Sequence, residues 1–189
     1  MTNVGVEGRG PVAHLVLNRP PLNVLTTAML AEFAAAVRDR AGREESRVLV
    51  VRGEGKGFSA GLDVKEHLPE TVESMLAAFR DALEAILQCR VPVVAQVHGP
   101  CLGGGMELAM AADLVYAADT AAFGQPEIKL GVFPPFAAAT YPTWFGRARA
   151  ADLVLLGESI PANEAFDRGF VSGVVPAADL AAKVGEVCG

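Results

Sequence analysis

Short apolar runs alternate with longer amphipathic stretches along the first half of the chain. The runs at residues 12–18, 47–53 and 91–99 are rich in Val and Leu and have the length of buried strands. Between them, residues 26–42 and 71–90 place apolar side chains at helical spacing. This pattern predicts strands that alternate with helices.

The two long amphipathic stretches define the helix faces that are expected to be buried. Thr26 is expected to cap the first helix, and Gly42 is expected to end it. The side chains expected to point inward are Met29, Leu30, Phe33 and Val37 in the first helix and Met75, Leu76, Phe79, Leu83, Ile86 and Leu87 in the second.

The second half continues the alternation in shorter pieces. A glycine-rich turn is followed by a helix from about Gly104 and a short strand near residues 113–117. Helices are predicted at residues 146–157 and 162–169, with a final helical stretch in "AADLAAKVGEV". The repeating unit of strand, strand and helix, in mostly parallel register, predicts one α/β domain over residues 1–189.

Composition and charge narrow the class of protein. With 51% apolar and 20% charged residues, the chain is globular in composition. A net charge of −6 argues against nucleic acid as the main partner and leaves anionic small ligands open. The sequence shows no signal peptide and no membrane-spanning run. The widely spaced Cys89, Cys101 and Cys188 favour reduced thiols, and we expect a cytoplasmic protein.

The stretch "GFSAG" at residues 57–61 fits the G-x-S-x-G pattern of serine esterases, with Ser59 as the nucleophile. That turn requires a strand running directly into the serine, whereas "GEGKGF" separates Ser59 from the preceding strand. A triad with Asp81 and His98 is formally possible, but His98 stands at a strand end before a tight glycine turn. The context therefore disfavours a serine hydrolase.

Two glutamates and a run of glycines form a richer candidate site. Residues 103–105 are all glycine, which allows a ligand to approach the backbone closely. Glu107 follows in the first helical turn, where a carboxylate can also serve simply to complement the helix dipole. Glu127 lies in "GQPE" among apolar neighbours that are expected to raise its pKa. Two carboxylates converging on one apolar pocket would divide into an acid and a base.

Four segments, occurring in order along most of the chain, carry a family resemblance. They are "FSAGLDVKE", "GGGMELAMAADLVYA", "AAFGQPEIKLGV" and "GESIPANEAFDRGFVSGVVP". The chain resembles the crotonase superfamily, the enoyl-CoA hydratases and isomerases. The resemblance implies a spiral of repeated ββα units and an acyl-CoA thioester as substrate. It also implies no cofactor, because coenzyme A is part of the substrate, and assembly into a homotrimer or hexamer.

The resemblance also assigns roles to residues of this sequence. The backbone N–H groups of Leu62 and Gly104 would form an oxyanion hole for the thioester oxygen. Glu107 would deprotonate the water that attacks Cβ, and Glu127 would deliver a proton to Cα. The substrate and its coenzyme A portion would be bound by Ala60, Leu62, Asp63, Val64, Lys65 and Gly104.

Two departures from the family pattern leave alternatives open. Where many members have a glycine-rich turn, this chain has "PPFAAATYP", with Pro134, Pro135 and Phe136, which resembles hydratases of cyclic dienoyl-CoA esters. Members usually continue beyond "AAKVGEVCG" with a helical region, so this chain is expected to be either a shortened member or a truncated one. The leading hypothesis is an enzyme that hydrates an α,β-unsaturated acyl-CoA. The alternatives are a cyclic dienoyl-CoA hydratase, a double-bond isomerase and a non-catalytic acyl-CoA-binding subunit.

Overall fold

The computed structural model describes residues 2–8 and 10–189 and contains a central six-stranded sheet. The strand order is β1-β2-β3-β4-β6-β9, with β1 antiparallel to β2 and every other neighbouring pair parallel. The predicted strands and their mostly parallel register are confirmed. The strands are β1 (Val4–Glu7), β2 (Val12–Leu17), β3 (Val48–Gly53), β4 (Val93–Val97), β6 (Leu114–Ala118) and β9 (Gly173–Val175).

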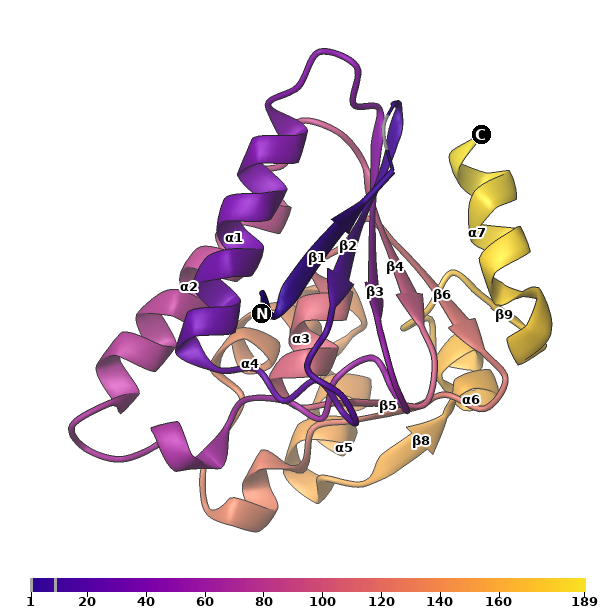
Figure 1. Cartoon of the computed structure of the whole chain (residues 1–189). Helices are drawn as coiled ribbons and strands as arrows, with labels where there is room; N and C mark the ends of the chain where they lie inside the picture. The colour runs from indigo at the N-terminus through magenta and orange to yellow at the C-terminus, as the bar shows by residue number, and fades with distance from the viewer. Residues whose placement is uncertain (1, 9) are drawn as a thin grey trace.

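Helices cover the two faces of this sheet unequally. Figure 1 shows α1 (Thr27–Ala41) and α2 (Val72–Leu87) on one side and α7 (Leu180–Cys188) on the other. The first side holds the main hydrophobic core, while α7 closes a small second cluster around Val50, Val94 and Val184. Both faces of the parallel strands are therefore covered near their centre, as such strands require.

The start of α1 follows the prediction. Thr26 has extended backbone, and its hydroxyl oxygen accepts a hydrogen bond from the Met29 N–H at 3.3 Å. The cap satisfies one of the N–H groups that the first turn leaves without a partner. The four predicted inward residues of this helix are all buried.

The predicted inner face of α2 was too wide. Met75, Phe79, Leu83 and Ile86 are buried, but the side chains of Leu76 and Leu87 are 41% and 50% exposed. The prediction for these two residues was wrong because α2 contacts the rest of the protein along a narrower stripe than its apolar sequence suggests.

A small second sheet joins the segments that carry the candidate site. It consists of β5 (Pro100–Leu102), β7 (Ala122–Gly124) and β8 (Ser159–Pro161), with β7 in the middle. The helix α3 (Gly104–Met110) follows β5, and the 3-10 helix η2 (Pro126–Leu130) follows β7. Because β5 and β7 are parallel, α3 and η2 leave the same edge of this sheet.

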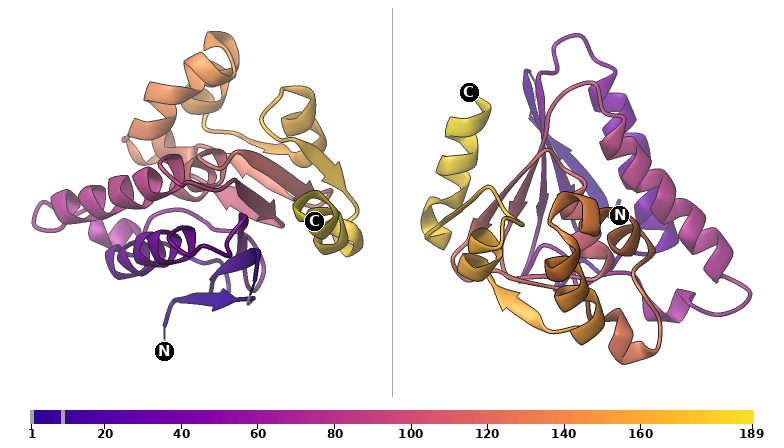
Figure 2. Two further views of the ribbon diagram at one scale, coloured as in Figure 1. Left: turned by 90° about the horizontal axis from the view of Figure 1, so that it is seen from above. Right: turned by 180° about the vertical axis from the view of Figure 1, so that it is seen from behind.

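The remaining elements form an outer layer beside the small sheet. Figure 2 shows α4 (Pro135–Trp144) and α5 (Arg147–Leu156), in orange, next to each other and away from the C-terminal helix. The sequence did not predict α4. The other elements are η1 (Val64–Glu66), α6 (Ala162–Asp167) and η3 (Ala177–Asp179). No helix in the described ranges is both long and apolar enough to cross a bilayer.

Candidate functional site

Two loops lie side by side at the candidate site. The Ser59 N–H donates to the Pro100 carbonyl oxygen at 3.1 Å, and the Leu102 N–H donates to the Ser59 carbonyl oxygen at 2.9 Å. Gly61, with φ of +97°, follows this pairing, and a Cβ on it would lie 3.5 Å from the Gly104 nitrogen. The segment "GFSAG" thus forms an isolated parallel bridge with β5, between Ser59 and Cys101, and ends next to the start of α3.

The Ser59 hydroxyl is fully used inside the protein. The side chain is 0% exposed, its Oγ donates to the Asn23 carbonyl oxygen at 2.8 Å, and it accepts from the Gly61 N–H at 3.1 Å. These bonds hold the turn that carries Leu62. Ser59 is therefore a structural residue of the loop.

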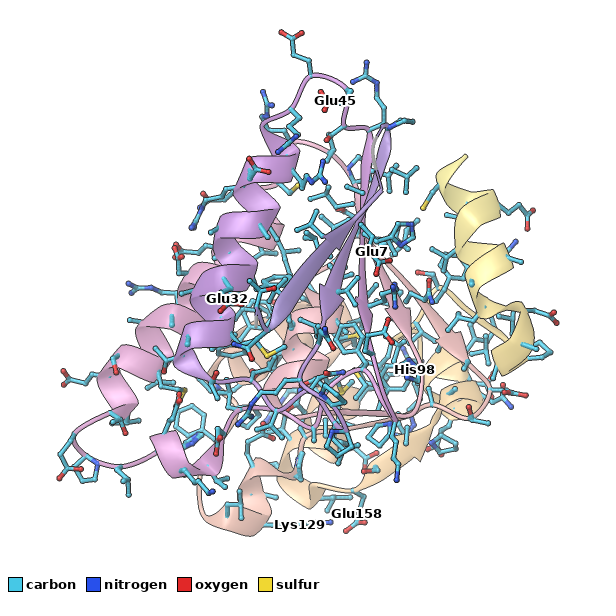
Figure 3. All side chains as sticks on the ribbon, viewed as in Figure 1. Glu7, Glu32, Glu45, His98, Lys129 and Glu158 are labelled. Atoms are coloured by element: carbon cyan, nitrogen blue, oxygen red, sulfur yellow. The ribbon has the colours of Figure 1, made fainter. Side chains whose placement is uncertain are left out.

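The hypothetical triad partners lie elsewhere. Asp81 forms an ion pair with Arg38, with 2.6 Å between carboxylate oxygen and guanidinium nitrogen. The ring of His98, labelled in Figure 3, lies 3.2 Å from the Gly55 carbonyl oxygen. Neither residue has a hydrogen bond to Ser59 in the described structure, which agrees with the argument against a serine hydrolase.

The two amides predicted for the oxyanion hole are on adjacent segments. Leu25 is paired with the residues on either side of Leu62, donating to Gly61 O at 2.8 Å and accepting from Asp63 N–H at 2.9 Å. In this parallel pairing the N–H of Leu62 points away from Leu25. A Cβ on Gly104 would lie 2.8 Å from Leu62 Cγ, so the structure brings these two residues together.

The residues predicted to meet coenzyme A follow directly along the chain. Ala60 is half-buried, and Asp63 caps η1 by accepting from the Lys65 N–H at 3.1 Å. Asp63 also lies 3.7 Å from the guanidinium of Arg19. Val64 and Lys65 are exposed beside this turn, as a contact surface for a large ligand would need.

Glu107 is 1% exposed, and it points from α3 toward the start of α4. Its Oε1 accepts from the Ala137 N–H at 2.7 Å, and α4, which begins at Pro135, has no side-chain cap of its own. The pKa of Glu107 is raised from 4.5 to about 8, chiefly by burial. The negative charge of Glu127 contributes to this rise, and the amides of Ala137 and Phe136 oppose it.

Glu127 approaches the same region from η2. A Cβ on Gly103 would lie 2.6 Å from Oε1 of Glu127, and the φ of Gly103 is +53°, so glycine is required here. Burial raises the pKa of Glu127, and its own backbone N–H opposes this. Glu127 is less completely buried than Glu107. The two predicted carboxylates thus converge, and burial raises the pKa of both.

Comparison with known proteins supports the family resemblance over most of the chain. A family model described as "Enoyl-CoA hydratase/isomerase" matches residues 7–189. The chain belongs to the enoyl-CoA hydratase/isomerase family.

Two similar members of the enoyl-CoA hydratase/isomerase family are bacterial proteins. The chain is 38% identical to cyclohexa-1,5-dienecarbonyl-CoA hydratase of Thauera aromatica, over 89% of this chain and 65% of that protein. It is 43% identical to a "probable enoyl-CoA hydratase" of Mycobacterium leprae, over 93% of this chain and 69% of that one. The chain spans between 64% and 69% of the length of the curated relatives that it matches.

Solved structures of family members share the fold. An enoyl-CoA hydratase/carnithine racemase from Magnetospirillum magneticum aligns with a TM-score of 0.93 at 30% identity, over all of this chain and 73% of that one. An enoyl-CoA hydratase from Bacillus anthracis aligns with a TM-score of 0.93 at 33% identity, over 98% and 75%. The predicted crotonase-type fold is therefore confirmed.

Sequence reasoning missed two buried polar residues of this family member, Gln125 and Tyr141. Neither side chain is exposed. The Gln125 amide lies between Glu127 and Tyr141, with Nε2 at 3.1 and 3.2 Å from the two Glu127 carboxylate oxygens and Oε1 at 3.1 Å from the Tyr141 hydroxyl. This amide orientation gives both ends of the side chain a partner. The segment "GQPE" was noted for its glutamate, and the neighbouring glutamine was the available signal.

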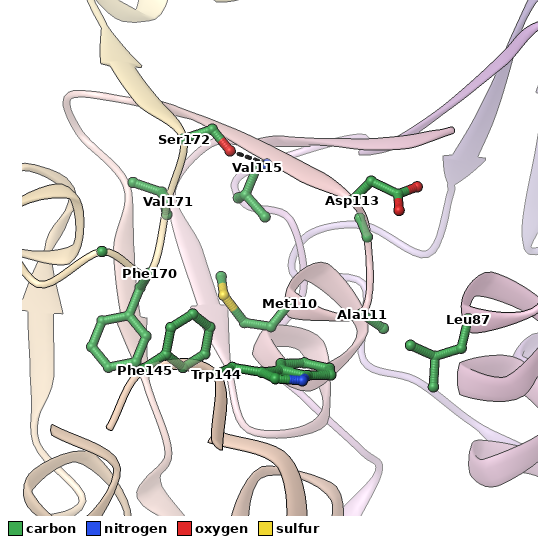
Figure 4. Close-up of a pocket in the computed structure, with 12 residues that line it drawn as sticks. Leu87, Met110, Ala111, Asp113, Val115, Trp144, Phe145, Phe170, Val171 and Ser172 are labelled. Atoms are coloured by element: carbon green, nitrogen blue, oxygen red, sulfur yellow. Dashed lines mark hydrogen bonds between the residues drawn. The ribbon is translucent and has the colours of Figure 1, made fainter. Parts of the chain in front are cut away.

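A separate cavity of about 420 Å³ lies at the far end of α3. Figure 4 shows the rings of Phe170, Phe145 and Trp144 in a row along one side, with Leu87 beyond Trp144 and Met110 above the rings in this view. None of the predicted site residues lines it. The candidate chemistry is therefore at the start of α3, and this hollow is distinct from it.

Proposed function

We propose that this family member adds water across the double bond of an α,β-unsaturated acyl-CoA thioester. The observation that carries the proposal is the convergence of the buried Glu107 and the half-buried Glu127, two carboxyl groups with raised pKa values, beside the amides of Leu62 and Gly104. Two of the similar relatives have names that specify enoyl-CoA hydration or dienecarbonyl-CoA hydration. Their activity is extended here to a chain that covers only part of their length.

The two backbone amides would stabilise the charge that develops during the reaction. Attack of water on Cβ moves negative charge onto the thioester oxygen and gives an enolate-like transition state. The N–H groups of Leu62 and Gly104, fixed by the paired loops, would donate to that oxygen. Loss of one such preorganised donor typically costs roughly 3 kcal/mol of transition-state stabilisation.

The two carboxyl groups would accept and donate the protons of the reaction. The water oxygen bonds to Cβ while its proton passes to Glu107, and Glu127 releases a proton to Cα. Burial raises the pKa of both carboxyl groups, which suits groups that exchange protons near neutral pH. After one addition of water the proton is on Glu107. This is also the protonation state of Glu107 that burial favours in the protein without substrate. The proton must then return to Glu127 before the next turnover.

A cyclic dienoyl-CoA ester is the second candidate substrate. The segment around Pro134, Pro135 and Phe136 replaces a glycine-rich turn and forms the start of α4, directly beside Glu107. The Thauera aromatica relative, which is named for such a substrate, supports this choice. The proposed reaction is otherwise the same, because both substrates have a double bond conjugated to the thioester.

Ultraviolet absorbance of the conjugated thioester tests the proposal. Addition of the protein to crotonyl-CoA or cyclohexa-1,5-dienecarbonyl-CoA should lower the absorbance, and the faster loss identifies the preferred substrate. Absorbance gained from a β,γ-enoyl-CoA would instead show an isomerase. Tight binding of both conjugated thioesters with no absorbance change would contradict the proposal and favour a non-catalytic acyl-CoA-binding subunit.

The reaction as proposed uses water and the two glutamates, and we propose that it requires no cofactor other than the coenzyme A of the substrate. A homotrimer or hexamer and a cytoplasmic location stay predictions. Light scattering of the purified protein would measure the assembly.

A further inference from the structure

The ring of Tyr141 is fixed by its aromatic surroundings. It lies on α4 with no exposed surface and packs edge-on against Phe145 at 5.2 Å between ring centroids. Phe170 and Trp144 lie at 6.3 and 6.4 Å. Such contacts restrict the movement of the ring and therefore fix the position of its hydroxyl oxygen.

The Tyr141 hydroxyl keeps its proton. Burial, and then the nearby charge of Glu107, raise the pKa of this phenol well above its usual range. Its hydrogen-bond partner in the described part of the chain is the Gln125 side-chain amide, at 3.1 Å. A neutral phenol has one proton to donate, and the carbonyl oxygen of that amide is the group able to accept it.

The amide can adopt two orientations with different consequences for Glu127. When Tyr141 donates to Gln125 Oε1, Nε2 faces the carboxylate at 3.1 and 3.2 Å and stabilises its ionised form. In the reverse orientation, Nε2 donates to the phenol at 3.1 Å and Oε1 faces Glu127. Only a protonated Glu127 can satisfy that second arrangement.

We propose that Tyr141 is a positioning residue for Glu127, acting through the orientation of the Gln125 amide, so that N–H donors are directed at the carboxylate. The inference rests on the proposed function, in which Glu127 gives its proton to Cα. Donation leaves an ionised carboxylate, and the amide stabilises that product of proton transfer. Tyr141 touches neither Glu127 nor the reacting atoms in this scheme.

Other titratable groups surround this chain of contacts. Glu107 on α3 and Cys101 on β5 both influence Tyr141 electrostatically. Lys129, two residues after Glu127, is paired with Glu158 at 3.1 Å, and Figure 3 labels this pair at the edge of the molecule. Glu107 is therefore the buried titratable neighbour whose titration must be separated from that of Glu127.

A direct measurement is the pH titration of the Glu127 carboxyl carbon by NMR, with Glu127→Gln identifying its resonance. Tyr141→Phe should raise the pKa of Glu127 by about one unit, because the amide no longer favours the donor-inward orientation. Tyr116→Phe is the matched control and should leave this titration unchanged, since Tyr116 is on β6 and its ring packs against Gly173.

Gln125→Met removes the connecting amide and keeps the proposal testable if Tyr141→Phe fails to fold. It should raise the pKa of Glu127 at least as much, and adding Tyr141→Phe should produce no further shift. An unchanged titration in a folded Tyr141→Phe or Gln125→Met variant would overturn the proposal. Additive shifts in the double variant would overturn it as well.

The same variants can be assayed for hydration. Tyr141→Phe should lower kcat by about tenfold, should leave KM nearly unchanged and should move the pH–rate profile, whereas a purely structural role would not move that profile. The NMR titration requires no turnover. A protein that shows the pKa shift but no hydration would contradict the proposed function while supporting the role of Tyr141.

Discussion

Ser59 and Glu107 lie on two glycine-rich segments in contact, and both side chains are buried. A Cβ on Gly105 would lie 2.7 Å from Ser59 Cβ, which shows how closely the segments approach. The Ser59 hydroxyl donates to the Asn23 carbonyl oxygen on a distant segment and accepts from the Gly61 N–H in its own loop. Glu107 accepts from the Ala137 amide and still has a strongly raised pKa. Both side chains are thus buried. Only at Glu107 do the hydrogen bonds fail to offset the cost of burying a charge, and this raised pKa marks a residue suited to proton transfer.

The largest effect that separates the two residues is expected in catalysis. Glu107→Gln or Glu127→Gln should lower kcat for hydration by about 10³-fold, because each removes a proton-transfer group. Affinity for the acyl-CoA, measured by calorimetry, should change little. Glu186→Gln, on the exposed C-terminal helix, is the control that should keep full activity. Normal hydration by Glu107→Gln would disprove the two-carboxylate mechanism.

The second effect concerns stability and pH. Between pH 4.5 and about 8 the folded protein keeps a proton on Glu107 that an unfolded chain has released, so stability should fall as pH rises. Glu107→Gln carries no such charge and should be more stable than wild type by roughly 3 kcal/mol at about pH 8.5. The two proteins should converge near pH 4.5.

Thermal denaturation followed by circular dichroism at several pH values measures this difference. Glu186→Gln should follow the wild-type curve because its carboxyl group is exposed. A wild-type and Glu107→Gln difference that stays constant from pH 4.5 to 8 would show that Glu107 is not the buried titrating group.

The smallest effect is expected for Ser59→Ala. It leaves the Gly61 N–H and the Asn23 carbonyl without a partner and should cost about 1–2 kcal/mol of stability. Hydration should remain within a few-fold of wild type, since the proposed nucleophile is water. Complete loss of activity in a folded Ser59→Ala protein would restore the nucleophile interpretation. Urea denaturation and the absorbance assay measure the two quantities.

Much of the fold could be predicted because its signals are local. The strands of the large sheet with long apolar runs and the helix at residues 26–42 follow from hydrophobic spacing, a Thr cap and a Gly stop. The helix α4 could not be predicted because Pro134, Pro135 and Pro142 resemble a loop signal. Pro135 in fact stands in the first helical turn, where the missing N–H costs nothing.

The candidate site was predictable only in part, because a sequence shows local patterns but not contacts between distant segments. The family resemblance assigned roles to Leu62, Gly104, Glu107 and Glu127, and the structure brings them together in pairs. The function of Ser59, Gln125 and Tyr141 depends on contacts between distant segments, which no local spacing reveals.

The bond from the Ala137 N–H to Glu107 makes the start of α4 sensitive to the state of that carboxyl group. Any ligand that draws Glu107 toward itself competes with the helix for the same oxygen. Breaking the bond between Glu107 and the Ala137 N–H would therefore weaken the apparent affinity for the ligand, and it would also make the first turn of α4 less stable. Hydrogen–deuterium exchange at the Ala137 amide would therefore report the occupancy of a site that the helix itself encloses.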